Sequence, residues 1–128
     1  MSHSITILEE VQVNNQTIQG QHTHSGGYRQ SLSESIPDES TDLEVVFPLD
    51  VSAIKAIFIK SDQDITIETN DGSSPDDTLT LTADCPYIWH ENSEFTNLLT
   101  ADVTSLFVTN ASGAAATLEI EAIVDATP

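Results

Sequence analysis

Short stretches in which apolar and polar residues alternate recur along most of this 128-residue chain. Successive side chains of a β-strand point to opposite faces, so a period of two predicts a strand with one buried face. The clearest alternation covers residues 42–49, 65–68, 78–82 and 118–124. Residues 54–59, with the sequence IKAIFI, are instead apolar on both faces, which predicts a central strand.

Further strands and the turns between them follow from the remaining apolar runs. Strands are expected at residues 5–13, 87–90 and 106–109, with turns at Asn14-Asn15, Asn70-Asp71-Gly72 and residues 110–113. Pro48 lacks a backbone donor, which places its strand at a sheet edge or close to the end of the strand. Residues 50–56 and 97–101 have room for one helical turn each.

About seven or eight short strands without an amphipathic helix are typical of an all-β domain with two packed sheets. We therefore expect an antiparallel β-sandwich or jelly roll with an extended N-terminal arm. If Phe58 lies in the core, Phe58→Ala should cost about 3–5 kcal/mol of stability. The core is expected to contain Val45, Phe47, Ile57, Phe58, Ile65, Ile67, Leu79, Leu81, Leu106, Val108, Leu118 and Ile120.

The first 40 residues fit this pattern less well. Residues 17–40 are rich in Ser, Gln, Gly and His, which predicts a long loop or extended arm. We therefore divide the chain into an arm and loop region, 1–40, and a sandwich domain, 41–128. The apolar residues of the arm have no clear place in a sandwich filled by later strands, so we expect them to bind a partner, with Arg29 paired to a carboxylate across the contact. The expected partner-binding residues are Ile5, Ile7, Leu8, Val11, Val13, Ile18 and Arg29.

The charge is strongly negative: three basic residues face 21 acidic ones, for a formal net charge of −18. Such a surface repels nucleic acid and anionic lipid, so neither is expected as a partner. No apolar run reaches 18 residues and no signal peptide is visible, so we expect no membrane association. Cys85 is the one cysteine, which excludes an intrachain disulfide.

Two groups of residues are candidate metal ligands. Acidic residues gather around Asp62 and Asp64, but the spacing fails the EF-hand pattern and favours a solvated loop. His22 and His24 can present two imidazoles from one strand face, with His90 or His3 as a third ligand. Because no cysteine-rich spacing accompanies them, ordinary polar loop histidines are the favoured interpretation, and no metal or cofactor is expected. Convergence of several copies at a symmetry axis stays open.

Catalytic patterns are missing from the sequence. It has no G-x-S-x-G elbow, no phosphate-binding glycine loop and no cluster of Lys or Arg to hold an oxyanion. Carboxylate pairs are frequent, but 21 acidic residues make chance pairs unavoidable. We therefore expect no catalytic residues and no enzymatic activity.

Three segments carry a resemblance to a known family: residues 50–81, the segment YIWHENSEF at 87–95, and residues 105–125. Together they resemble small proteins encoded in the structural-gene clusters of tailed bacteriophages, which are similar to head decoration, or cement, proteins. The resemblance covers about the last 80 residues and includes no catalytic motif. It does not extend to the first 45 residues.

The resemblance implies a virion protein on the outer capsid surface that stabilises the coat lattice. Its expected partners are the major capsid protein and further copies of itself, as a homotrimer. The alternative is a tail- or fibre-associated β-sandwich that binds host glycans, which predicts an exposed aromatic patch around Tyr87 and Trp89. A hydrolase of cell-wall or capsule sugars is a third hypothesis, and it needs a cleft with two carboxylates at working distance.

Overall fold

The computed structural model describes residues 2–125, and within them the chain is all-β. No helix in this range is long and apolar enough to cross a membrane. Residues 1 and 126–128, which the predicted domain ranges include, lie outside the described residues. The elements are β1 (His3–Val13), β2 (Gln16–Gly26), β3 (Tyr28–Ile36), β4 (Ser40–Leu49), the 3₁₀ turn η1 (Val51–Ala53), β5 (Ile54–Ser61), β6 (Ile65–Thr69), β7 (Thr78–Leu81), β8 (Tyr87–His90), β9 (Val103–Asn110) and β10 (Ala116–Val124).

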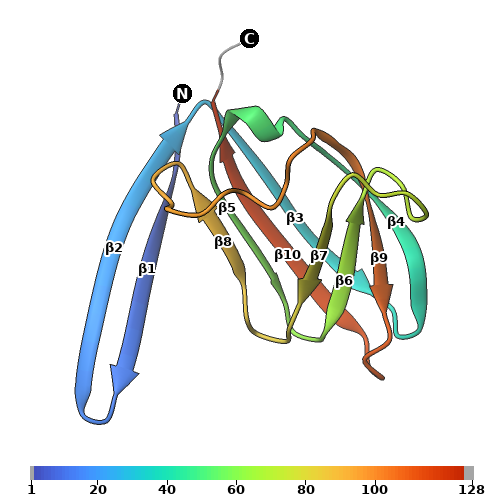
Figure 1. Ribbon diagram of the computed structural model, residues 1–128, viewed down its shortest axis with the longest axis horizontal. Coiled ribbons are helices and arrows are strands. Elements are labelled where there is room, and N and C mark those ends of the chain that lie inside the picture. The colour runs from blue at the N-terminus through green and yellow to red at the C-terminus, as the bar shows by residue number, and fades with distance from the viewer. Residues whose placement is uncertain (1, 126–128) are drawn as a thin grey trace.

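Strands β3 to β10 form two antiparallel four-stranded sheets that lie face to face (Figure 1). One sheet has the order β3-β10-β5-β8 and the other β4-β9-β6-β7. The expected all-β, antiparallel sandwich architecture is therefore confirmed. Strand β4 lies at a sheet edge and carries Pro48 next to its last residue, as the missing backbone donor predicts.

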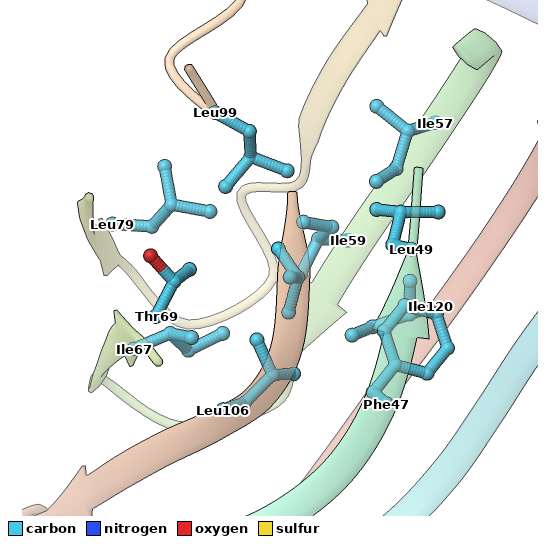
Figure 2. A pocket seen from close by; sticks show the side chains of 11 residues that line it. Phe47, Leu49, Ile57, Ile59, Ile67, Thr69, Leu79, Leu99, Leu106 and Ile120 are labelled. Carbon is cyan, nitrogen blue, oxygen red and sulfur yellow. The ribbon is translucent and has the colours of Figure 1, made fainter. Parts of the chain in front are cut away.

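The core lies between the two sheets and consists mainly of Ile, Leu and Val side chains. In Figure 2 these side chains, from both sheets, point into one shared interior. The space they leave is a cavity of about 10 Å³, which is no larger than one water molecule needs. The interior is therefore filled by the chain's own side chains and has no room for a ligand.

All of the predicted core residues except Phe58 belong to this cluster. Phe58 pairs with Glu121 on β10 and Ile88 on β8, whereas its neighbours Ile57 and Ile59 pair with the core residues of those strands. Its side chain therefore points to the outer face of the sheet, where it is half-buried. Placing Phe58 in the core was wrong, because a strand covered on both faces gives no signal for which face is inward.

The prediction of a long loop over residues 17–40 was also wrong. Most of this segment forms β2 and β3, and β3 pairs with β10 along its whole length. The sandwich therefore begins at Tyr28, before the predicted boundary at residue 41. Strand β3 lies at the sheet edge, where Leu32 and Ile36 are its only residues packed with the core cluster, and most of its other residues are polar.

Strands β1 and β2 form a separate two-stranded hairpin whose closed end extends away from the sandwich (Figure 1). Their register is unbroken from His3–Gly26 to Val13–Gln16. The turn between them is made by Asn14 and Asn15, with Asn14 at φ 56°, a conformation that Asn tolerates better than most residues. The expected break in the first strand at these residues is confirmed as a tight hairpin turn.

The open end of the hairpin rests against the outer face of the β3-β10-β5-β8 sheet, where β1 meets β10 and β2 meets both β10 and β5. Gly26 marks the closest approach: a Cβ at this position would lie 2.5 Å from the carbonyl oxygen of Val124. It would also lie 3.0 Å from Cγ2 of Ile123, which the hairpin helps to bury although it points away from the core. Only glycine permits this contact.

Candidate functional site

One face of the hairpin combines apolar residues with two histidines. The register pairs Ile5 with His24, Ile7 with His22, and Val11 with Ile18, and directly opposed residues of an antiparallel pair share a face. Near the open end this face meets the sandwich, so Ile7 is only 5% exposed. We call it the inner face.

Beyond the sandwich the same face is uncovered. Val11 and Ile18 are 55% and 66% exposed, and Val13 lies beside them near the turn. We call Val11, Val13 and Ile18 the distal patch. Leu8 is also exposed but belongs to the opposite face of the hairpin. Four of the predicted partner-binding residues are therefore open to solvent in this chain: Leu8, Val11, Val13 and Ile18.

The other predicted partner-binding residues are engaged within the chain. Ile5 is half-buried and Ile7 is buried at the open end of the hairpin. Arg29, at the start of β3, makes a bidentate pair with Glu121 on β10: its Nε and Nη2 donate to the two carboxylate oxygens at 2.9 and 2.7 Å. The carboxylate expected across an intermolecular contact is thus supplied by the same chain.

A cluster of three histidines lies where the hairpin meets the sandwich. His22 and His24 are two residues apart on β2 and share the inner face, while His90 ends β8 and shares the outer face of its sheet with Ala56. One ring nitrogen from each lies within 4.8 Å of the others. His24 is buried and the other two are half-buried. We call these three residues the histidine cluster.

Carboxylates hold two of these rings in place. His22 Nδ1 and His24 Nε2 face each other at 2.7 Å. The outer nitrogens donate to carboxylates: His22 Nε2 to Glu9 at 3.1 Å, and His24 Nδ1 to Glu91 at 3.1 Å. Lys55 reaches the other oxygen of Glu91 at 3.5 Å.

The third ring, His90, is uncharged in this arrangement. The backbone N–H of Asn92 donates to His90 Nδ1 at 3.2 Å, so that nitrogen carries a lone pair. Burial lowers the pKa of His90, and the neighbouring His22 and His24 lower it further. The hydrogen bond from His24 lowers the pKa of Glu91, which keeps that carboxylate ionised.

The histidine interpretation therefore changes. His22 and His24 lie on a strand and meet His90 across the fold, so they are not ordinary loop residues. His3 pairs with Gly26 at the open end and stays outside the cluster. The spacing of His22 and His24 was the available sequence signal; the carboxylates of Glu9 and Glu91 had none, because both are far from their histidine partners in the sequence.

The acidic candidates serve the fold instead. Asp62 accepts a hydrogen bond from the backbone of Thr117 at 2.8 Å, and Asp64 accepts one from the backbone of Ala83 at 2.8 Å. Each carboxylate thus fixes a connection between strands. Within residues 2–125, the histidine cluster is the one group of three or more potential ligands whose ligating atoms converge.

Tyr87 and Trp89 do not form an exposed aromatic patch. Both are half-buried on the core-facing side of β8. The Tyr87 hydroxyl donates to the Asn97 side chain and accepts from the backbone of Leu98, and Trp89 Nε1 donates to the carbonyl of Phe95 at 3.0 Å. Their polar atoms are used inside the chain.

An open groove of about 450 Å³ runs beside the histidine cluster, with Glu9 and His90 in its lining, so the cluster can be reached from solvent. A scan of protein-family models, a search of curated proteins and a search of solved structures each find no significant match to this chain.

Proposed function

We propose that this protein is a structural subunit of an assembled particle and that its hairpin binds a neighbouring subunit. The observation that carries the proposal is the distal patch: an apolar face that the chain covers at Ile7 and leaves open at Val11 and Ile18. Exposed apolar residues that continue a buried face are typical of protein contacts. Because the hairpin projects from the sandwich, these residues can contact a neighbouring subunit at a distance from it (Figure 1).

The backbone of the hairpin supports the same use. Within residues 2–125, β1 and β2 pair only with each other, so each strand leaves one edge without a neighbour. A strand of another subunit can add to such an edge, which satisfies backbone groups while alternate side chains are buried. We infer that strand addition and the distal patch act together.

We further propose that the particle is a tailed-phage capsid, that the partners are the major capsid protein and other copies of this chain in a trimer, and that the protein decorates the outer surface and stabilises the lattice. The resemblance of residues 50–81, 87–95 and 105–125 to decoration proteins supports this. The net charge of −18 suits an outer surface that must stay solvated.

The strand order also supports a viral structural role. Counted from β3, one sheet holds the first, eighth, third and sixth strands and the other the second, seventh, fourth and fifth. We infer from this order that the sandwich is a jelly roll, an architecture used by viral capsid and lectin domains. Lectins are the sugar-binding alternative, but the half-buried Tyr87 and Trp89 offer no stacking surface for it.

The test compares two pairs of substitutions on opposite faces of the hairpin. Val11→Ser with Ile18→Ser removes two of the three apolar side chains of the distal patch, and Gln12→Ser with Thr17→Ser alters the register pair next to them on the other face. Each variant is co-sedimented with capsids that lack the decoration layer. We expect at least a tenfold weaker affinity for the first pair and an unchanged affinity for the second.

Equal binding by both variants would exclude the distal patch as the contact. Absence of binding by the unmodified protein, together with a positive result on a glycan array, would replace the capsid proposal with sugar binding.

A further inference from the structure

We propose that His22, His24 and His90 bind a divalent transition-metal ion of the Zn²⁺ class, which fastens the hairpin to the sandwich. The three rings come from two parts of the fold: β2 supplies two and β8 supplies one. Their ligating nitrogens already lie within 4.8 Å of one another. Imidazole nitrogen is a ligand suited to Zn²⁺, Cu²⁺ and Ni²⁺ rather than to Ca²⁺ or Mg²⁺.

The distances match a metal centre after small side-chain movements. In a tetrahedral Zn²⁺ site with metal–nitrogen bonds of about 2.0–2.1 Å, the ligand nitrogens lie about 3.3 Å apart. His22 Nδ1 and His24 Nε2, now 2.7 Å apart, need to separate by about 0.6 Å, and His90 needs to approach them. Ring rotations bring the nitrogens closer, and His90 must also give up its hydrogen bond from Asn92, because neutral histidine has one lone-pair nitrogen and Nδ1 uses it for that bond.

The hydrogen bonds around the cluster direct lone pairs toward its centre. Glu9 and Glu91 accept hydrogen bonds from the outer nitrogens of His22 and His24. In their neutral forms, both rings then present lone pairs at the inner nitrogens, which face each other at 2.7 Å. Two such lone pairs repel unless a cation lies between them, so this arrangement requires either a proton or a metal ion. Carboxylates on the outer nitrogens of histidines are the usual support of metal ligands.

The local charge also favours a divalent cation. Glu9 and Glu91 carry two negative charges, and the nearest basic group is Lys55, 3.5 Å from Glu91. With Lys55, these groups sum to a charge of −1, which attracts a cation, and a divalent ion brings the sum to +1. His22 and His90 are half-buried and border solvent, which leaves room for water as a fourth ligand and a path for the metal to enter.

Metal binding would change how firmly the hairpin is held. In the absence of the ion, the docked end of β2 contacts β5 and β10, and His24 donates a hydrogen bond to Glu91, which directly follows β8. A metal bound to His22, His24 and His90 adds a link from β2 to β8. The hairpin would then be held more firmly at the end where it already docks.

The experiment uses the full-length chain after treatment with a chelator. Zn²⁺ is titrated by calorimetry in the presence of excess Mg²⁺, which occupies carboxylates but competes poorly for imidazole. We expect one Zn²⁺ per chain, a higher melting temperature, and slower amide hydrogen exchange in β2 and β8. Co²⁺ in place of Zn²⁺ should give the visible absorption of a tetrahedral nitrogen site.

Three variants assign the site. His22→Gln and His90→Gln should each abolish the stoichiometric Zn²⁺ binding, and Glu9→Gln should weaken it by about 10–100-fold. His3→Gln is the matched control, because His3 lies on the same hairpin outside the cluster, and it should bind Zn²⁺ like the unmodified chain.

The cluster would be a hydrogen-bonded group without a metal role if the unmodified chain bound no Zn²⁺ above the Mg²⁺ background. Binding that survives both His22→Gln and His90→Gln would overturn the assignment equally, since the ion would then lie elsewhere. Circular dichroism and the melting temperature of each variant without metal show whether it folds. If a variant does not fold, Co²⁺ absorption of the unmodified chain decides the ligand type.

Discussion

Glu68 on β6 and Asp42 on β4 are two neighbouring carboxyl groups, which form a hydrogen bond when one of them is protonated. This hydrogen bond raises the pKa of Glu68, and partial burial and the charges of Asp42 and Asp71 raise it further. A hydrogen bond of this kind stabilises the folded chain only while one of the two carboxyls is protonated. At neutral pH the pair is therefore a source of repulsion in the folded chain.

The first prediction follows from the sign of this shift. A carboxyl whose folded pKa is raised binds its proton more tightly in the folded than in the unfolded chain, so it reduces stability above that pKa and has no effect well below the unfolded value of 4.5. Glu68→Gln should therefore raise the melting temperature at pH 7. The gain should shrink as the pH falls toward 4, and thermal melts at both pH values measure it.

Glu34→Gln provides the control, because Glu34 is an exposed carboxylate on β3, in the other sheet. It should change the melting temperature little at either pH. An equal gain for Glu68→Gln at pH 4 and pH 7 would show that lost charge repulsion is not its cause.

At the scale of single elements, strand β5 separates two kinds of apolar residue. Ile57 is fully buried between the sheets, whereas Phe58 lies half-buried on the outer face. We predict that Ile57→Ala lowers the free energy of unfolding by about 3–5 kcal/mol, because it leaves a cavity in the core. Phe58→Ala should cost only about 1–2 kcal/mol, in keeping with its partial burial. Urea denaturation of both variants measures the difference, and a larger loss for Phe58→Ala would contradict this placement.

The hairpin itself depends on one close approach. Gly26→Ala would place a Cβ 2.5 Å from the Val124 carbonyl, so we predict that this substitution loosens the hairpin while the sandwich stays folded. Amide hydrogen exchange should become faster in β1 and β2 and stay unchanged in β9. Gly20→Ala is the matched control on the same strand, because nothing lies within 4 Å of its added Cβ. Equal exchange in the two variants would show that the contact at Gly26 is not what holds the hairpin.

The same elements show what a sequence can and cannot predict here. Strands β6 and β10 were predicted because one face of each is buried and the other is more exposed. Apolar and polar residues therefore alternate along these strands with a period of two. Strand β2 was missed because most of its residues are exposed on both faces, so nothing selects for alternation. The His22–His24 spacing was visible, but the third ring, His90, joins them only through the docking of β2 against the sheet.

For the molecule as a whole, charge and apolar surface act against each other. A net charge of −18 repels other copies of the chain, while the distal patch favours contact. We predict that self-association, with a trimer as the end state, tightens as salt rises from about 0.05 to 0.5 M, because the screening length shortens. Light scattering at a series of salt concentrations measures this. A monomer at every concentration would restrict the proposed trimer to the capsid surface.

The length of the hairpin limits how far its uncovered part extends from the sandwich. Its inner face is covered as far as Ile7, and the strand continues through residues 8–13 to the turn. Six residues of extended strand at about 3.4 Å each span about 20 Å. If the hairpin binds a neighbouring subunit as proposed, the bound surface must lie within about 20 Å of the sandwich that carries the hairpin.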